Sequence, residues 1–300
     1  KESKGISNSV ITDMRLAQKS ITSVVSEAER MAGFNIDKLL VAISGAQATS
    51  TRKQICGKIA SDVVKNNDIM KLAEKIRGDF KSKNREIIHL IPLQYRIDGS
   101  PPVSNPRYMS GEELSAKFHI VSTSTTTIKN IENCLKRCQL SVNNYIIEPF
   151  SSSLGTLSDN EMNLGTLTID IGSNATSFAI LSEGKLIHVG STALGGSNIT
   201  KDISIILNIS TDMAEKIKNL NNSLMISPIE EREIIKLRYP QAPDSNDIRI
   251  TRIELRDIIQ SRIEEILESV KSSLEKSNIP VNMLSNIVIT GGVTSTIAMD

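Results

Sequence analysis

The sequence contains no tryptophan, and aromatic residues make up only 3% of its 300 residues. We therefore expect a core filled mainly by Ile, Leu and Val. The three cysteines cannot all pair, and Cys134 and Cys138 lie four residues apart in a predicted helix over 127–138. We interpret them as buried thiols rather than as a metal or redox site, because no second Cys or His pair at zinc spacing accompanies them.

The sequence also lacks long apolar runs and an excess of either charge. No run approaches the roughly 18 apolar residues that a membrane span needs, and the polar start at Lys1–Lys4 leads into no apolar signal-peptide core. The 35 basic and 34 acidic residues nearly cancel, for a net charge of +1. This balance argues against a nucleic-acid partner and against a generally basic membrane-binding face. The sequence is typical of a soluble, globular protein of a reducing compartment, with room for two domains of roughly 100–200 residues each.

Predicted strands and helices alternate along the chain, which indicates an α/β fold. We expect a helix over 12–33 with an apolar stripe, capped by Thr12 and ended by Gly33. A second, long helix begins at the capping box Thr251–Glu254. The remaining predicted strands are 39–43, 87–97, 117–122, 186–189 and 287–289, and the remaining predicted helices are 67–76, 199–207, 212–220 and 230–237.

The most informative stretch is Asp170–Ile180, which reads Asp-Ile-Gly-Ser-Asn-Ala-Thr-Ser-Phe-Ala-Ile. Apolar runs on both sides of a small polar turn predict a strand, a tight turn and a second strand. Such a hairpin can point backbone N–H groups at a phosphate, and Asp170 can hold Mg²⁺ or order its waters. An acid and a glycine at a turn are also what an ordinary hairpin contains.

Three further features follow the hairpin in the chain. Gly195-Gly196 stands at the entry of a predicted helix, where the missing side chains let the backbone approach a ligand closely. Glu215 and Lys218 are three residues apart, share a helix face, and could both meet a ribose or a base edge. Gly291-Gly292 follows a buried strand and could admit an adenosine or its α-phosphate. Each is ordinary alone, as a turn or a surface pair, but their order favours a nucleotide site.

In this order the features resemble the actin/Hsp70/sugar-kinase superfamily, and within it the bacterial cell-division family FtsA. The resemblance covers nearly all 300 residues. Its first three segments are specific, because they resemble a subdomain that ordinary actins lack. The segments that carry it are Val10–Asp13 with Ala28–Arg30, Val41–Gly45, Ile88–Pro92 with Tyr95, Asp98 and Gly99, Pro106 with Met109–Gly111, and Ile199–Ile203.

The resemblance implies an actin-like (ribonuclease H-like), two-lobed ATPase fold with an FtsA-type subdomain 1C. Residues 1–105 would be mainly 1C and 106–162 part of 1A. Residues 163–198 and 276–300 would form the two parts of 2A, with 2B at 199–275 between them. The family has an earlier phosphate loop and a C-terminal amphipathic helix that binds the inner membrane. We expect this chain to lack both family termini and not to reach the membrane by itself.

The resemblance also implies ATP and Mg²⁺ as cofactors, with Asp170 as a catalytic residue and metal ligand. The other implied nucleotide-binding residues are Gly172, Ser173, Asn174, Ala175, Thr176, Gly195, Gly196, Glu215, Lys218, Gly291 and Gly292. Glu148 occupies the place of a glutamate thought to position the attacking water in the related bacterial actin MreB. The alternative for Glu148 is an acid at a helix N-terminus, where the helix dipole favours it.

The hairpin departs from the family pattern Asp-x-Gly-Gly-Gly-Thr-Thr/Met-Asp. Ser173 and Asn174 replace two glycines, Ala175 replaces the first threonine, and Ser177 replaces the final acid. Because Asn tolerates positive φ, we expect the turn to survive. The lost hydroxyl and the lost acid weaken the case for hydrolysis more than the case for binding. We therefore expect a slow ATPase at most, and primarily a nucleotide-dependent scaffold.

The resemblance implies a protein that polymerises into protofilaments at the cytoplasmic face of the inner membrane at the division septum. It would link the FtsZ ring to the membrane and recruit later division proteins. FtsZ would dock on 2B, where Glu230, Arg232, Lys236 and Arg238 are candidate contacts, unless they form an ordinary solvated face. Later division proteins would meet 1C, around 15–30 and 53–65.

Two other functions remain open at this point. One is the scaffold of another machine, as in PilM-type pilus assembly, which shares the fold and part of the pattern. The other is a sugar-kinase-branch phosphotransferase, for which no sugar-binding signature is visible. Co-sedimentation with FtsZ separates the first from an FtsA-like role, and sugar-dependent ATP consumption would support the second.

Overall fold

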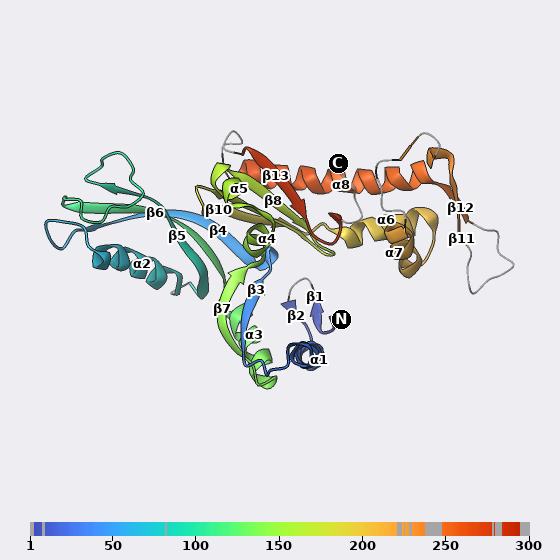
Figure 1. Cartoon of the computed structure of the whole chain (residues 1–300), viewed down its shortest axis with the longest axis horizontal. Coiled ribbons are helices and arrows are strands. Elements are labelled where there is room, and N and C mark those ends of the chain that lie inside the picture. The colour runs from blue at the N-terminus through green and yellow to red at the C-terminus, as the bar shows by residue number, and fades with distance from the viewer. Residues whose placement is uncertain are drawn as a thin grey trace. The chain divides into compact units, whose positions relative to one another are not determined.

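The alternation of strands and helices predicted from the sequence is present in the computed structural model (Figure 1). The structure describes residues 3–7, 10–81, 83–220, 224, 226, 227, 230–237, 248–277, 279 and 284–294. The chain divides into two units. Unit 1 comprises Lys1–Leu167, Phe178–Gly190 and Leu284–Asn286, and unit 2 comprises Thr168–Ser177, Ser191–Met283 and Ile287–Asp300.

A three-stranded antiparallel sheet in unit 1 has the order β4-β6-β5, formed by Ala48–Lys58, Glu113–Ser124 and Arg85–Ile97. Helix α2 (Asn66–Lys81) covers one of its faces (Figure 1). Strand β4 is absent from our sequence prediction, although it pairs with β6 over its whole length, from Ala48↔Thr123 to Lys58↔Glu113. Most of its residues are polar, so no apolar run marks it.

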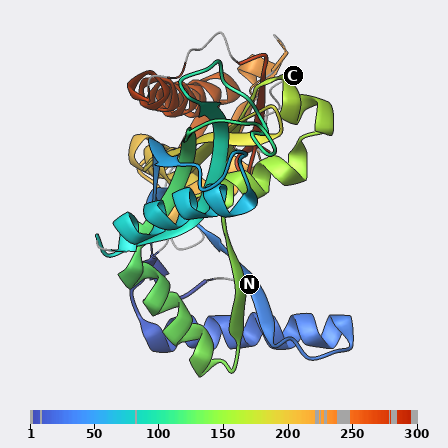
Figure 2. The same ribbon diagram turned by 90° about the vertical axis from the view of Figure 1, so that its left-hand side faces the viewer.

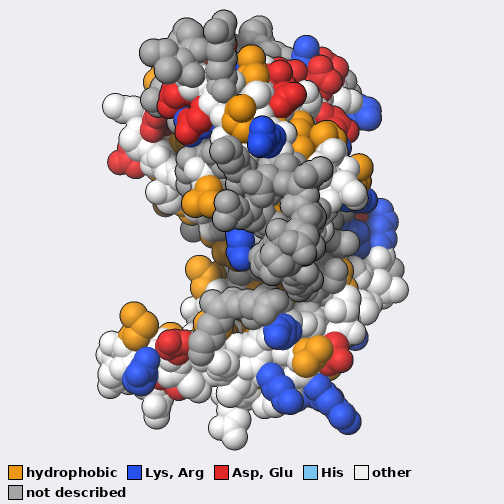
Figure 3. All heavy atoms as spheres, turned by 90° about the vertical axis from the view of Figure 1, so that its right-hand side faces the viewer, with side chains coloured by type: hydrophobic (Ala, Val, Ile, Leu, Met, Phe, Trp, Pro, Cys, Tyr) orange, Lys and Arg blue, Asp and Glu red, His pale blue; other side chains and the backbone are white. Residues whose placement is uncertain are grey.

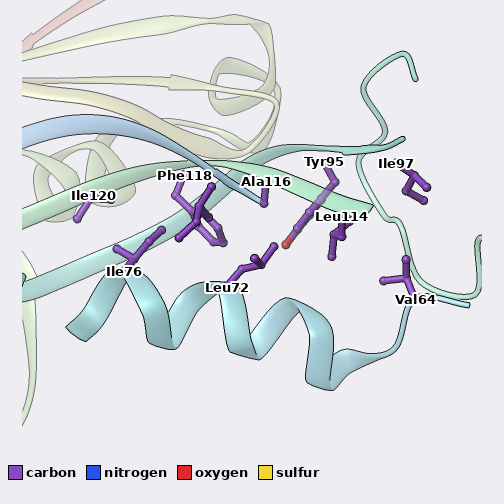
Figure 4. Packing of buried hydrophobic residues seen from close by; sticks show 10 residues of the cluster. Val64, Leu72, Ile76, Tyr95, Ile97, Leu114, Ala116, Phe118 and Ile120 are labelled. Carbon is purple, nitrogen blue, oxygen red and sulfur yellow. The ribbon is translucent and has the colours of Figure 1, made fainter. Parts of the chain in front are cut away.

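The core of this sheet lies between α2 and the apolar face of the strands (Figure 4). Leu72 and Ile76, four residues apart on one face of α2, point toward Phe118 of β6 and its neighbours. Full burial of side chains of this size contributes about 1.5–3 kcal/mol each. The buried members of the cluster are Ile55, Val64, Leu72, Ile76, Tyr95, Ile97, Leu114, Ala116, Phe118 and Ile120.

A second part of unit 1 contains the parallel pair β3 (Lys38–Ile43) and β7 (Ser141–Ile147), with helices α1 (Met14–Ala32) and α3 (Thr125–Arg137), as Figure 2 shows. The predicted cap Thr12 is wrong. The carboxylate of Asp13 accepts hydrogen bonds from the N–H groups of Arg15 and Leu16 at 2.8 and 2.9 Å, because Asp13 stands next to the first helical residue. Gly33 ends α1 with φ of 76°, as predicted.

Unit 1 also contains smaller elements: β1 (Ile6–Ser7), β2 (Val10–Ile11), the 3₁₀ turn η1 (Gly45–Gln47), α4 (Glu148–Thr156) and α5 (Asp159–Leu164). The thiols of α3 and its C-cap agree with the prediction only in part. Cys134 is fully buried, and burial raises the pKa of its thiol. Cys138 is half-buried, with Sγ 3.8 Å from the carbonyl oxygen of Gln18.

The predicted hairpin is formed by β8 (Thr166–Ile171) and β9 (Thr176–Ser182). They are the central strands of a four-stranded sheet of order β10-β9-β8-β13, completed by β10 (Lys185–Thr192) and β13 (Asn286–Thr290). Nearly every residue of β8 and β9 is buried. Strands covered on both faces show continuous apolar runs, which explains why this hairpin is visible in the sequence.

A buried polar chain in unit 1 joins β4, β6 and β10. His119 Nδ1 lies 2.8 Å from the carbonyl oxygen of Leu186, so this nitrogen donates, and Nε2 accepts from the hydroxyl of Ser50 at 2.8 Å. The single hydroxyl proton of Ser50 is thereby used. His188 Nδ1, 3.1 Å from the same hydroxyl oxygen, must then be a donor. Both imidazoles are neutral, and burial lowers the pKa of each to about 4.

Unit 2 contains helices α6 (Gly196–Leu207), α7 (Thr211–Leu220) and α8 (Arg252–Lys276). The predicted capping box of α8 is confirmed, since Thr251 and Glu254 cap each other. Arg262 of α8 binds both carboxylate oxygens of Asp202 on α6, at 2.6 and 2.8 Å. The buried stripe of α8 is Leu255, Ile259, Ile263, Ile266, Val270 and Leu274.

The helix predicted over 230–237 is wrong. A 3₁₀ turn, η2 (Glu230–Arg232), leads into strand β11 (Ile234–Leu237), which pairs antiparallel with β12 (Ile248–Thr251). The β-branched pair Ile234-Ile235 favours the strand, and its partner lies beyond a segment outside the described residues. Sequence periodicity over so short a stretch cannot distinguish these outcomes.

The boundary near residue 105, which we predicted for 1C, falls inside the three-stranded sheet, because β6 follows it and pairs with β4 and β5. The limits of all five segments remain predictions. Among the described helices, none is both long and apolar enough to cross a membrane.

Candidate functional site

The turn between β8 and β9 is held by the first turn of α6. Within the turn, the N–H of Gly172 donates to the carbonyl of Ala175 at 3.0 Å. The carbonyl of Gly172 accepts from the N–H of Gly196 at 2.9 Å, and that of Ser173 accepts from Ser197 at 2.7 Å. The carbonyl groups of Gly172, Ser173 and Ala175 are therefore bound to protein partners.

The N–H groups of the same turn are arranged differently. Those of Ser173, Asn174 and Ala175 form no hydrogen bond with any residue that the structure describes. Ser173 and Asn174 are exposed, and Ala175 is half-buried. Successive backbone N–H groups without protein acceptors are a common way to bind an anion such as a phosphate. The predicted phosphate-binding role of this turn therefore has suitable donors.

Gly195 is required for the approach of α6 to this turn. A Cβ atom on Gly195 would lie 2.6 Å from the carbonyl oxygen of Gly172, 2.7 Å from that of Ser173 and 2.9 Å from the nitrogen of Ala175. All three are backbone atoms, which cannot rotate away. A Cβ on Gly196 would lie 2.7 Å from the side chain of Val293. The two glycines thus pack against protein on this side, and their predicted approach to a ligand stays a prediction.

Three polar side chains join the turn to α6. The hydroxyl of Ser197 donates to Asn174 Oδ1 at 2.8 Å, and the Oγ atoms of Ser173 and Ser197 are 2.8 Å apart. Since the proton of Ser197 is used, Ser173 is the donor to Ser197. Our sequence reasoning missed Ser197, because no local pattern connects it with a turn 23 residues earlier. Thr176 is buried, and its hydroxyl donates to the carbonyl of Leu194 at 2.8 Å.

The end of β13 meets the end of β8. Gly291 has φ of 103°, and a Cβ there would lie 2.5 Å from Oδ1 of Asp170 and 2.6 Å from the carbonyl oxygen of Ile171. The N–H of Val293 donates to the same carbonyl at 3.3 Å. Gly292 is exposed, and no atom of the residues that the structure describes lies within 4 Å of a Cβ built on it. The structure thus brings Asp170 and Gly291 together.

Glu215 and Lys218 share a face of α7, as predicted, but they bind each other. Lys218 Nζ lies 2.7 Å from the carboxylate of Glu215, 2.9 Å from the hydroxyl of Thr200 and 3.3 Å from the carbonyl oxygen of Gly196. The Lys218 side chain is 5% exposed and that of Glu215 is 47% exposed. Burial raises the pKa of Glu215, but hydrogen bonds from Lys218 and Thr200 outweigh it and leave the pKa below its usual value. A ligand contact by either residue stays a prediction.

Glu148 belongs to unit 1, whereas every other predicted site residue belongs to unit 2. It is the first residue of α4, and its carboxylate accepts from the N–H of Gly45 at 3.3 Å. The preceding N–H, of Ile147, donates to His89 Nε2 at 3.0 Å. The ring of His89 also packs edge-on against Phe150 at 5.4 Å. The catalytic role of Glu148 stays a prediction. Its position at a helix N-terminus fits the alternative, an acid favoured by the helix dipole, equally well.

Asp170 is the single metal ligand that we predicted. Among the described residues, no group of three or more His, Cys, Asp or Glu side chains could hold a metal ion. Mg²⁺ is commonly bound through one or two carboxylates together with the phosphates of a nucleotide. One partly buried carboxylate beside the predicted phosphate-binding turn therefore fits Mg²⁺ that would arrive with ATP.

Solved structures define the class of fold. The chain is similar to the "PilM-PilN type IV pilus biogenesis complex" (TM-score 0.65, 14% identity, 99% of this chain and 73% of that chain). It is also similar to MreB5 of Spiroplasma citri bound to ADP (TM-score 0.61, 18% identity, 99% of this chain and 69% of that chain). The chain has the actin-like fold that the sequence predicted.

Sequence comparison identifies the family. The family model "Cell division protein FtsA" matches residues 167–295, and "SHS2 domain inserted in FTSA" matches residues 45–122. The cell division protein FtsA of Neisseria meningitidis is 30% identical over 293 residues, with 97% of this chain and 70% of that protein covered. FtsA of Agrobacterium fabrum is 31% identical over 294 residues. The chain belongs to the FtsA family of bacterial cell-division proteins.

The alignment with the Agrobacterium relative covers 97% of this chain but 66% of the relative. The same shares hold for FtsA of Bacillus subtilis, at 29% identity. The chain thus spans about two thirds of the length of these relatives.

Proposed function

We propose that the chain binds ATP with Mg²⁺ at the turn between β8 and β9. The observation that carries this proposal is the row of three N–H groups at Ser173–Ala175, whose neighbouring carbonyls are bound to α6. These groups would hold a phosphate, and Asp170 would hold Mg²⁺ or its waters. The adenosine would lie beside Gly292, where no atom of the described residues is within 4 Å of a Cβ position. Mg²⁺, when bound, would offset the charge of the phosphates.

The test is the affinity for ATP with and without Mg²⁺, compared between Asp170→Asn and the matched control Asp212→Asn, which changes an exposed acid on α7 of the same unit. We expect Mg²⁺ to strengthen ATP binding by the wild type and by the control. In Asp170→Asn this strengthening should fall by about tenfold, as for the loss of a charge-assisted contact. No ATP binding by the wild type would overturn the nucleotide proposal. An unchanged Mg²⁺ effect in Asp170→Asn would remove Asp170 from it.

We expect slow hydrolysis. The hydroxyl of Thr176 is buried and bonded to Leu194, and Ser177, which replaces the family's second acid, is 3% exposed. Ser177→Asp restores that acid, and Ser177→Asn provides a variant of the same shape without the charge. Faster turnover in the first variant alone would support the role of the acid, and fast turnover by the wild type would contradict the proposed slow ATPase.

For the whole protein we propose the role of the FtsA family. It would polymerise, link the FtsZ ring to the cytoplasmic face of the inner membrane at the septum, and recruit later division proteins. Support comes from membership of the family and from the match to its inserted SHS2 domain. Co-sedimentation with FtsZ filaments tests the link. Its failure, with ATP binding intact, would favour a PilM-like scaffold.

The proposed FtsZ surface lies in the segment predicted as 2B. Arg252 binds the carboxylates of Glu230 and Glu233 at 3.0 and 3.2 Å. Among the other candidate contacts, Arg238 lies outside the described residues, as do the side chains of Arg232 and Lys236. On the face in Figure 3, acidic, basic and hydrophobic side chains are interspersed over the part that the structure describes. A surface of mixed charge suits a peptide that carries both charges.

The proposed contacts with later division proteins are 15–30 on α1 and 53–65, which comprises the end of β4 and the segment that follows it. Several side chains of α1 in this range are exposed, among them Leu16, Val24 and Arg30. Exposed apolar side chains with basic neighbours could receive a partner peptide. Binding of purified partner segments to the chain, compared with Val24→Asp, would test this face.

A further inference from the structure

Ser197 contacts the turn between β8 and β9 through both its backbone and its side chain. Its N–H binds the carbonyl oxygen of Ser173, and its hydroxyl bridges the side chains of Ser173 and Asn174. One residue at the start of α6 thus holds both the backbone and the side chains of the turn. We call the three side chains of Ser173, Asn174 and Ser197 the serine clasp.

The two turn members of the clasp are residues at which this chain departs from the glycine-rich family pattern. A turn of glycines has more backbone freedom and no side chain that a helix could hold. Here three exposed side chains hydrogen-bond to one another and restrict the conformations of the turn. The loss of conformational freedom occurs when the protein folds, so it does not have to occur when a ligand binds.

We propose that Ser197 is a positioning residue that holds the N–H groups of Ser173–Ala175 in the conformation that receives a phosphate. Ser197 need not touch the ligand, since it acts through Ser173 and Asn174. The inference rests on the proposed nucleotide site and adds a residue to it. The side-chain hydrogen bonds of the serine clasp would hold the turn in one conformation, whereas a turn of glycines would stay flexible.

The principal variant is Ser197→Ala, which removes the two side-chain hydrogen bonds and keeps the backbone bond to Ser173. We expect affinity for Mg²⁺–ATP to fall about three- to tenfold, because the turn must then be ordered on binding. Ser197→Thr keeps the hydroxyl and should restore most of the affinity. The matched control is Ser204→Ala, which removes a hydroxyl from the same helix that bonds the carbonyl of Ile209 at 2.6 Å.

Two readouts separate positioning from general stability. The thermal midpoint without nucleotide should fall no more in Ser197→Ala than in Ser204→Ala, because both lose hydroxyl hydrogen bonds at helix ends. Amide hydrogen exchange in a peptide that covers the turn should accelerate in Ser197→Ala alone. A purely structural role would instead lower the midpoint and leave the affinity of the folded protein unchanged.

A double-mutant cycle closes the test. Ser173→Gly with Asn174→Gly removes the other half of the clasp, so Ser197→Ala should have no further effect on ATP affinity in that background. An equal effect in both backgrounds would overturn the clasp. Wild-type binding that Ser197→Ala leaves unchanged would overturn the role of Ser197 alone. No binding by the wild type would overturn the nucleotide site itself, and the positioning role with it.

Discussion

Acidification from pH 7 to pH 5 should lower the free energy of unfolding of unit 1 by about 3–4 kcal/mol. The source is the polar chain of His119, Ser50 and His188, in which both imidazoles are neutral. Burial lowers the pKa of His119 to about 4 and that of His188 to about 4, and the positive charge of Arg52 acts in the same direction. Burial also lowers the pKa of His89, which is the remaining histidine of the protein and lies outside this polar chain.

The sign follows from proton uptake. Between pH 6.5 and 4 the unfolded chain binds protons that the folded chain does not, so stability is fully present above pH 6.5 and is lost as the pH falls toward 4. With pKa values of 6.5 unfolded and about 4 folded, each histidine contributes a loss of about 2 kcal/mol at pH 5. His188 is only partly buried, which reduces its share.

Urea unfolding at the two pH values measures this loss. Tyrosine fluorescence is a suitable probe, because three of the four tyrosines, Tyr95, Tyr108 and Tyr145, belong to unit 1. His119→Phe removes one of the two titrating imidazoles of the polar chain. Between pH 7 and pH 5 this variant should therefore lose about half as much free energy of unfolding as the wild type. A wild-type loss below about 1 kcal/mol, or histidine NMR signals that titrate near pH 6.5 in the folded protein, would refute the reasoning.

Three further predictions follow from packing and charge. Gly195→Ala should destabilise unit 2 by about 2 kcal/mol or more in urea unfolding, since the new Cβ would meet three backbone atoms. The control is Gly155→Ala in α4, where the new Cβ would meet no described atom within 4 Å. This control should be neutral or stabilising by up to about 1 kcal/mol. Arg262→Met should lower the free energy of unfolding by about 1–3 kcal/mol, because it leaves a partly buried carboxylate without its two hydrogen bonds; a loss below about 0.5 kcal/mol would contradict this. A thiol reagent should modify exposed Cys56 well before buried Cys134, and equal rates would show that α3 opens readily.

Features that depend on neighbours in sequence could be predicted. The hairpin at Asp170 and the capping box at Thr251 are both formed within a few residues, and both are present. Strand β4 was missed, because a polar strand is stabilised by its pairing with β6, which is distant along the chain, from Ala48↔Thr123 to Lys58↔Glu113. The cap of α1 was placed one residue early, at Thr12 instead of Asp13, which is the usual uncertainty at a helix end.

In the candidate site, too, local features could be predicted and features that depend on distant contacts could not. The turn that follows Asp170 could be predicted from its residue types, and the shared face of Glu215 and Lys218 could be predicted from their spacing. The clasp of Ser197, the contact of Gly195 with the turn, and the burial of Lys218 could not. Each depends on how α6 packs against segments distant in the chain, and no local periodicity encodes that packing.

The position of Lys218 also has a consequence for motion. Its ammonium group is buried and binds oxygen atoms of Gly196, Thr200 and Glu215. If α7 separated from α6, a buried charge would lose partners on α6, at a cost of several kcal/mol. The two helices should therefore open together, as one cooperative unit in hydrogen exchange, with similar protection along both. The start of α6, and with it the turn that it holds, would then be as slow to open as the most protected part of α7.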